Sequence, residues 1–89
     1  MHEMSRRLRR RVEADFREPG SADEVMRMVS QASDTERIQA AIVLWAGGDL
    51  SRIRDSVELI QVDRRDVLVR GGLADEDWPR RLDAELGSA

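Results

Sequence analysis

The amino-acid sequence predicts an all-α fold, a small bundle of four to six short helices that begins with an amphipathic, Arg-rich N-terminal helix. Apolar residues recur at intervals of three and four along most of the chain, as they do on one face of an α-helix. Capping sequences and two Gly-Gly steps divide this pattern into short segments. Strand-like alternation of apolar and polar residues is rare, and the run Val67–Val69 is too short to count.

Length and composition bound the class of protein. The chain has 89 residues, enough for one domain. We expect residues 1–20 to form the Arg-rich helix or extension and residues 21–89 the helical domain. The longest apolar run, Ala40–Ala46, is too short to span a bilayer, and the charged N-terminus lacks the apolar core of a secretion signal. We therefore expect a cytoplasmic protein that does not associate with membranes.

The first predicted helix lies in MSRRLRRRVEADF, where arginine fills five of the six positions from 6 to 11. Met4, Leu8, Val12 and Phe16 follow at intervals of four and form one apolar stripe, and the arginines occupy the rest of the circumference. This stripe docks either on the body of the domain or on a second subunit.

Two capping-box sequences predict the next two helix starts. In SADE, Ser21 is the expected N-cap and Glu24 the residue that returns to its backbone N–H, and SDTE, from Ser33, repeats the signature. The helix after SDTE includes Ala40–Ala46 and is apolar nearly all round. We therefore expect it to be the central and most buried helix.

The second half of the chain is divided by aspartates and glycines. Gly47 and Gly48 end the central helix, and Asp49 caps the next one. Asp63 is the expected cap of a further short helix, although one long helix over Leu50–Arg70 fits the pattern equally well. Residues 73–86 predict an acidic turn followed by a last helix, with a proline in its first turn.

The leading functional hypothesis is a non-enzymatic protein-interaction or homodimerisation module. A chain this short buries a small core, so spare apolar surface favours a second protomer as partner. Trp78 is either an interface anchor beside a charged rim or part of the domain's own core. The candidate interaction surface consists of four residues: Leu8, Val12, Phe16 and Trp78.

The alternative hypothesis is a DNA-associated regulator that uses a helix-turn-helix-like pair around Gly47 and Gly48. Two of the N-terminal arginines, Arg9 and Arg11, stand four residues before an acid and can pair with it. The net charge of −3 and pI near 5.1 argue against a dedicated nucleic-acid binder. The candidate contacts are Arg6, Arg7, Arg9, Arg10, Arg11, Arg52 and Arg54.

Residues that could carry catalysis are scarce. The single histidine, His2, lies at the terminus, and the chain has no cysteine, lysine or tyrosine. WAGGDL lacks the preceding strand and the lysine of a phosphate loop, and Asp49 would place a carboxylate where the phosphate belongs. The acids Asp75–Asp77 are consecutive, so they do not converge on one metal ion. We expect no enzyme activity, no cofactor, no metal and no small-molecule substrate.

Residues 33–86 resemble a group of short, uncharacterised all-helical bacterial proteins from GC-rich genomes. The resemblance lies in AGGDLSRIRDSVEL (Ala46–Leu59), DRRDVLV (Asp63–Val69) and GLADEDWP (Gly72–Pro79). A GC-rich genome also fits the composition, because all fifteen basic residues are arginine and asparagine and tyrosine are absent. No activity or site is attached to that group. The resemblance implies only that residues 46–79 form a recurring structural unit.

Overall fold

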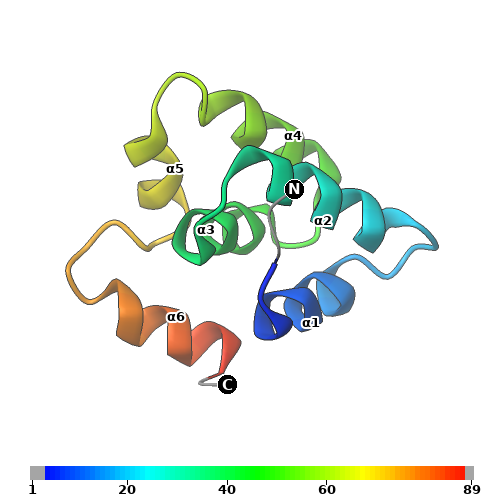
Figure 1. The fold of residues 1–89 in the computed structure, drawn as a ribbon, viewed down its shortest axis with the longest axis horizontal. Helices are drawn as coiled ribbons and strands as arrows, with labels where there is room; N and C mark the ends of the chain where they lie inside the picture. Colours follow the sequence, from blue (N-terminus) through cyan, green and yellow to red (C-terminus); the bar gives the residue numbers. More distant parts are fainter. Residues whose placement is uncertain (1–3, 88–89) are drawn as a thin grey trace.

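The computed structural model describes residues 4–87, and these residues fold into six helices with no strand among them. The predicted all-α bundle is confirmed. The helices are joined by short turns and loops (Figure 1). In chain order they are α1 (Arg6–Asp15), α2 (Ser21–Ala32), α3 (Glu36–Ala46), α4 (Leu50–Leu59), α5 (Arg64–Arg70) and α6 (Trp78–Leu86).

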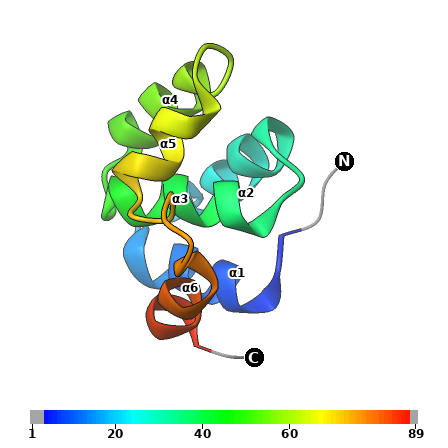
Figure 2. The ribbon, with the colours of Figure 1, turned by 90° about the vertical axis from the view of Figure 1, so that its left-hand side faces the viewer.

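Helix α3 forms the centre of the bundle, as its apolar sequence predicts. It contacts each of the other five helices, and most of its residues are buried, including the polar Gln39. Gln39 donates from Nε2 to the carbonyl oxygen of Ser33 at 2.7 Å, so its burial leaves no donor unpaired. Helices α4 and α5 pack on one side of α3, and α1 and α6 on the opposite side (Figures 1 and 2). We call these two sides the α4–α5 end and the α1–α6 end.

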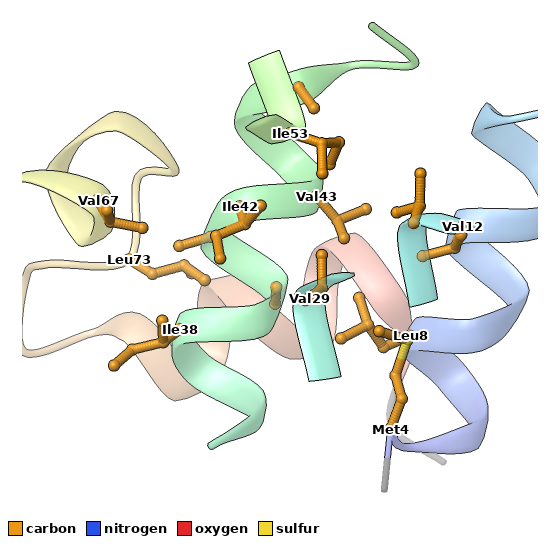
Figure 3. Packing of buried hydrophobic residues seen from close by; sticks show 14 of the residues in the cluster. Met4, Leu8, Val12, Val29, Ile38, Ile42, Val43, Ile53, Val67 and Leu73 are labelled. Carbon is orange, nitrogen blue, oxygen red and sulfur yellow. The ribbon is translucent and has the colours of Figure 1, made fainter. Parts of the chain in front are cut away.

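The apolar stripe of α1 is part of the core. Leu8 and Val12 are fully buried, and Met4 and Phe16 are each 5% exposed. Figure 3 shows Met4, Leu8 and Val12 pointing toward the centre of the molecule, in the same cluster as side chains of the central helix. Helix α1 contacts α2, α3 and α6, so it shares one core with the rest of the described chain.

This packing corrects the predicted interaction surface. Leu8, Val12 and Phe16 cannot dock against a second protomer, because the chain's own helices already cover them. A domain of this size gains stability by burying every large apolar side chain available to it. The prediction that these three residues form an intermolecular surface is therefore wrong. Of the two predicted alternatives, the stripe docks on the body of the domain.

Two predicted helix caps are shifted. Gly20, in the left-handed conformation with φ 82°, is the N-cap of α2, and the hydroxyl of Ser21 donates to the carbonyl oxygen of Glu18 instead. Thr35, rather than Ser33, caps α3 by accepting from the backbone N–H of Ile38. In both cases a neighbouring residue with a suitable backbone conformation takes the cap, so the predicted N-caps Ser21 and Ser33 are wrong.

The caps of α4 and α5 are as predicted. Asp49 accepts from the backbone N–H of Ser51 at 2.9 Å and from its hydroxyl at 2.7 Å, and these hydrogen bonds lower the pKa of the Asp49 carboxyl. The Asp63 side chain accepts from the backbone N–H of Asp66. Residues 50–70 therefore form two helices, because a turn closed by the N–H of Asp63 on the carbonyl oxygen of Leu59 separates them.

Gly71 lies where the end of α5 packs closely against α3. Its backbone is in the ordinary right-handed region, so conformation does not require glycine here. A Cβ at this position would lie 2.6 Å from both the Cβ and the carbonyl oxygen of Ala41 in α3. Glycine at 71 is needed for space, because it lets the end of α5 lie directly on the central helix.

Candidate functional site

Arg7 belongs to a network that joins three parts of the chain at the α1–α6 end. Its guanidinium donates two hydrogen bonds to Glu36, from Nε at 2.8 Å and from Nη2 at 2.7 Å. Its Nη1 donates to Asp83 at 2.6 Å and to the carbonyl oxygen of Gly87 at 2.7 Å. The hydrogen bonds from Arg7, with a further one from Ser5, lower the pKa of the Glu36 carboxyl against the opposing effect of burial. Arg7 therefore holds the bundle together and is not free to contact a ligand.

Arg11 is also engaged within the chain. It pairs with Asp15 at 3.0 Å, as its spacing of four residues predicts, and with Glu85 of α6 at 3.5 Å. The other predicted pair, Arg9 with Glu13, is not among the ion pairs of residues 4–87. Arg11 thus gives α1 a second link to α6.

The remaining N-terminal arginines do not form a basic groove. Arg6, Arg9 and Arg10 are exposed, and Arg10 is engaged in an interaction of its own. Arg6 and Arg9 line a hollow of about 490 Å³ together with two acids, Asp34 and Glu36. The mixed charge of this hollow makes it a poor match for a run of phosphates.

The predicted helix-turn-helix pair exists as α3 and α4, but its arginines have partners in the chain. Arg52 donates to the carbonyl oxygen of Trp45 at 3.2 Å, and its guanidinium lies over the Trp45 ring, 5.1 Å from the ring centroid. Arg54 contacts Glu24 of α2 at 3.4 Å. A DNA backbone would therefore have to compete with these partners in the chain for both arginine side chains.

Trp78, the predicted interface anchor, makes its contacts inside the chain. It is partly buried and packs against the edge of the core. The Arg37 guanidinium lies 4.7 Å from its ring centroid and also donates to the carbonyl oxygens of Leu73 and Ala74, at 3.0 and 3.3 Å. This arrangement fixes the loop before α6 on α3. A role of Trp78 as an interface anchor stays a prediction.

A second tryptophan forms a more open surface that the sequence reasoning missed. Trp45 lies in the last turn of α3 and is only partly buried. Besides Arg52, Arg70 of α5 places its guanidinium 4.6 Å from the Trp45 ring centroid. Tryptophan and arginine are the residue types most often found at the energetic centre of protein interfaces.

An exposed aliphatic side chain lies beside this tryptophan. Val62 is 84% exposed and Val69 is 55% exposed, and these are the large apolar side chains that the described part of the chain leaves open to water. Val62 lines a hollow of about 350 Å³ whose wall includes Trp45. We call this surface the Trp45 face and define it by seven residues: Trp45, Arg52, Asp55, Glu58, Leu59, Val62 and Arg70.

The Trp45 face carries charges of both signs. Asp55 and Glu58 of α4 and Arg70 of α5 line the same hollow. None of the three takes part in an ion pair among residues 4–87. The face therefore combines an apolar centre with charges that have no partner of opposite sign within the described chain.

No sequence signal places these residues together. Trp45 reads as the end of an apolar helix, and 25 residues separate it from Arg70. Val62 and Val69 stand in the segment whose division into one or two helices the sequence left open. Helices α4 and α5 lie on one side of α3 (Figure 1), and Val62, in the turn between them, reaches the hollow that Trp45 lines.

Comparisons with known proteins assign no role to this site. No protein-family model, no curated protein and no solved structure matches the chain. The resemblance of residues 33–86 to short bacterial proteins therefore stays a prediction. Within residues 4–87, no group of three or more His, Cys, Asp or Glu side chains is arranged to hold a metal ion, and no helix has the length and apolar character needed to cross a membrane.

Proposed function

We propose that this chain is a non-enzymatic interaction module that associates with a second copy of itself through the Trp45 face. The observation that carries the proposal is the exposure of Val62 beside a partly buried tryptophan. In a chain that buries even the apolar stripe of its first helix, a valine left in water is the exception. Covering it on association removes apolar surface from water and stabilises the complex.

The charges of the face favour a second copy as the partner. A surface with unpaired acids and an unpaired arginine around one hollow can be complementary to itself, because two copies can exchange opposite charges. A partner of one sign would meet repulsion from half of the face. The face has few residues compared with the roughly 20–30 that each partner contributes to a stable interface, so we expect a weak dimer that forms and dissociates with concentration.

The contacts of the arginines give less support to a DNA-associated regulator. Arg7, Arg11, Arg52 and Arg54 each bind another part of the chain, and the overall charge is negative. Titration of a labelled DNA duplex at two salt concentrations separates the two proposals. Binding at low salt that weakens steeply as salt rises would favour the regulator.

Sedimentation velocity over a range from micromolar to millimolar protein tests the proposal. Wild type should shift from monomer toward dimer as its concentration rises. Val62→Asp should stay monomeric, because a carboxylate would be buried without a partner in the interface. Ala14→Asp is the matched control, since Ala14 is exposed on α1, away from the face, and this variant should dimerise as wild type does.

A wild-type chain that stays monomeric up to millimolar concentration would contradict the proposal. So would a dimer that Val62→Asp and Ala14→Asp form equally well, because the interface would then lie elsewhere. Circular dichroism of each variant checks that the helices are intact before association is compared.

A further inference from the structure

We infer that α6 opens from the bundle as a unit while the other five helices stay folded, and that arginines of α1 control this opening. The inference does not depend on the proposed function, because α6 packs on the side of α3 opposite α4 and α5 (Figure 2). It assigns to the α1–α6 end a conformational change that responds to salt.

The apolar contact between α6 and the rest of the bundle is small. Leu82 is the buried residue among the nine of α6, whereas seven residues of α3 are buried. Trp78 and Leu86 are partly buried, and the other six residues of α6 are exposed. Among the helices of residues 4–87, α6 contacts α1 and α3 alone. Docking of α6 therefore covers little apolar surface and gains correspondingly little from the hydrophobic effect.

The packing beneath α6 is also incomplete. A hollow of about 310 Å³ lies between α6 and the body of the bundle. Its wall includes Arg11 of α1 and Leu44 of α3 on the body, and Ala84 and Glu85 on α6. Side chains that line a hollow lose close contacts that a filled interior would give them. The contact of α6 is therefore weaker than that of α5, whose end packs closely on α3 at Gly71.

Polar contacts from two arginines of α1 hold α6 in place. Arg7 donates from Nη1 to Asp83 at 2.6 Å and to the carbonyl oxygen of Gly87 at 2.7 Å. Arg11 donates to the carbonyl oxygen of Glu85 at 3.3 Å and lies 3.5 Å from its carboxylate. The side chains of Asp83 and Glu85 are each 54% exposed, so dissolved salt reaches both ion pairs and screens them.

The segment before α6 gives the opening a fixed point. Leu73 is 1% exposed and belongs to the core. Its N–H donates to the carbonyl oxygen of Leu68 at 2.9 Å, and its own carbonyl oxygen accepts from Arg37 at 3.0 Å. Trp78, the first residue of α6, is held at its ring by the guanidinium of Arg37. We therefore place the boundary of the opening segment between Leu73, which stays in the core, and Trp78, which leaves with the helix.

Native-state hydrogen exchange of the full chain, followed by NMR, tests the inference. Each rate is compared with that of an unstructured peptide in the same solution. The amides of residues 82–86 should exchange through an opening at least roughly tenfold more populated than the one that exposes the amides of α3. This opening should depend weakly on urea, because releasing one small helix exposes little surface. Raising salt from about 0.1 M to about 1 M shortens the Debye length from about 10 Å to about 3 Å and should speed exchange in α6 relative to α3.

Asp83→Asn tests the role of the arginines. It removes the ion pair with Arg7 at an exposed position and should speed exchange in α6 by about threefold relative to α3. Loss of an acid from the last turn of a helix is stabilising by itself, so faster exchange reports the lost contact. Glu76→Gln is the matched control, because it removes an exposed acid that is outside the ion pairs of residues 4–87. Exchange in α6 of this control should match wild type.

The outcomes decide both parts of the inference. Faster exchange of α6 in Asp83→Asn, with α3 and the Glu76→Gln control unchanged, supports it. Amides of α6 that share the protection and the urea dependence of α3 would overturn it, because the helix would then leave only when the whole chain unfolds. An α6 that opens separately but responds neither to salt nor to Asp83→Asn would overturn the control by arginine.

Discussion

The two tryptophans of this chain occupy opposite ends of the bundle. Both contact an arginine, but the surfaces around the two rings differ. Each is partly buried, and each has an arginine guanidinium over its ring. At Trp78 that arginine, Arg37, also binds two backbone carbonyl groups and closes a loop on the core. At Trp45 the ring borders exposed Val62 and a hollow with unpaired charges.

The difference teaches that composition alone does not mark a binding surface. The α1–α6 end contains more arginine than the α4–α5 end, but Arg7 and Arg11 are bound to carboxylates of the same chain. Of the eight charged side chains of α4 and α5, only Arg54 forms an ion pair within residues 4–87. The two ends therefore differ in how far their charges are paired within the chain.

Truncation of one aliphatic residue at each end should give the largest contrast. Leu8→Ala removes a fully buried side chain from α1, and we expect it to lower the free energy of unfolding by about 3–5 kcal/mol. Val62→Ala at the other end should change it by less than about 0.5 kcal/mol, because Val62 is already in water. Urea unfolding at low micromolar concentration measures both. Equal costs at the two positions would contradict the burial assigned to α1.

The junction between the two ends depends on Gly71. A methyl group at this position collides with Ala41 of α3, so Gly71→Ala should destabilise the fold by about 3 kcal/mol through overpacking. Thermal unfolding followed by circular dichroism measures the loss. Gly47→Asn is the matched control, since no atom lies within 4 Å of a Cβ there and asparagine tolerates its left-handed conformation. A Gly71→Ala variant as stable as the control would show that the helices do not approach this closely.

Replacing one arginine at each end sharpens the comparison of their contacts. Arg7→Met leaves Glu36 and Asp83 without their donor and should cost about 2 kcal/mol of stability, the range for hydrogen bonds to charged groups. Arg70→Met removes only an exposed guanidinium–ring contact, so its cost should stay below about 1 kcal/mol. Urea unfolding of the two variants compares them directly. Arg7→Met should lose more unfolding free energy than Arg70→Met. A larger loss for Arg70→Met would contradict the network described at Arg7.

The pH dependence of the Arg7–Glu36 contact should give the smallest effect. The Arg7 hydrogen bonds hold the pKa of Glu36 below its ordinary value, so the stability they contribute is fully present above that ordinary value, about 4.3. It is lost as the pH falls through the lower pKa of the folded state. The difference in unfolding free energy between wild type and Glu36→Gln should therefore be constant from about pH 6 to 8 and shrink below about pH 4.3. A difference that grows in acid would contradict the assigned sign.

Much of the fold follows from local signals in the sequence. The apolar run around Ile42 predicted a buried central helix, and Asp49 and Asp63 predicted two helix starts, because a cap depends on residues only a few positions away. The caps at Ser21 and Ser33 were misplaced by one or two residues, since neighbouring Gly20 and Thr35 offered competing solutions.

The candidate site could not be predicted in the same way. An amphipathic stripe such as Leu8–Val12–Phe16 shows which side of α1 is buried but not whether its cover comes from the same chain. The Trp45 face depends on the hairpin of α4 and α5, which joins residues up to 25 positions apart. Its defining property, an exposed valine beside a partly buried tryptophan, is a feature of the three-dimensional arrangement and has no counterpart in a sequence pattern.

The most direct test of this account is a dilution series followed by the two indole N–H signals in the ¹⁵N NMR spectrum. The chain has two tryptophans, so the experiment carries its own control. The signal of Trp45 should move progressively as the protein is diluted from millimolar to micromolar concentration, while the signal of Trp78 stays in place. Two stationary signals, or a shift at Trp78 alone, would contradict the assignment of the Trp45 face as the surface through which the chain associates.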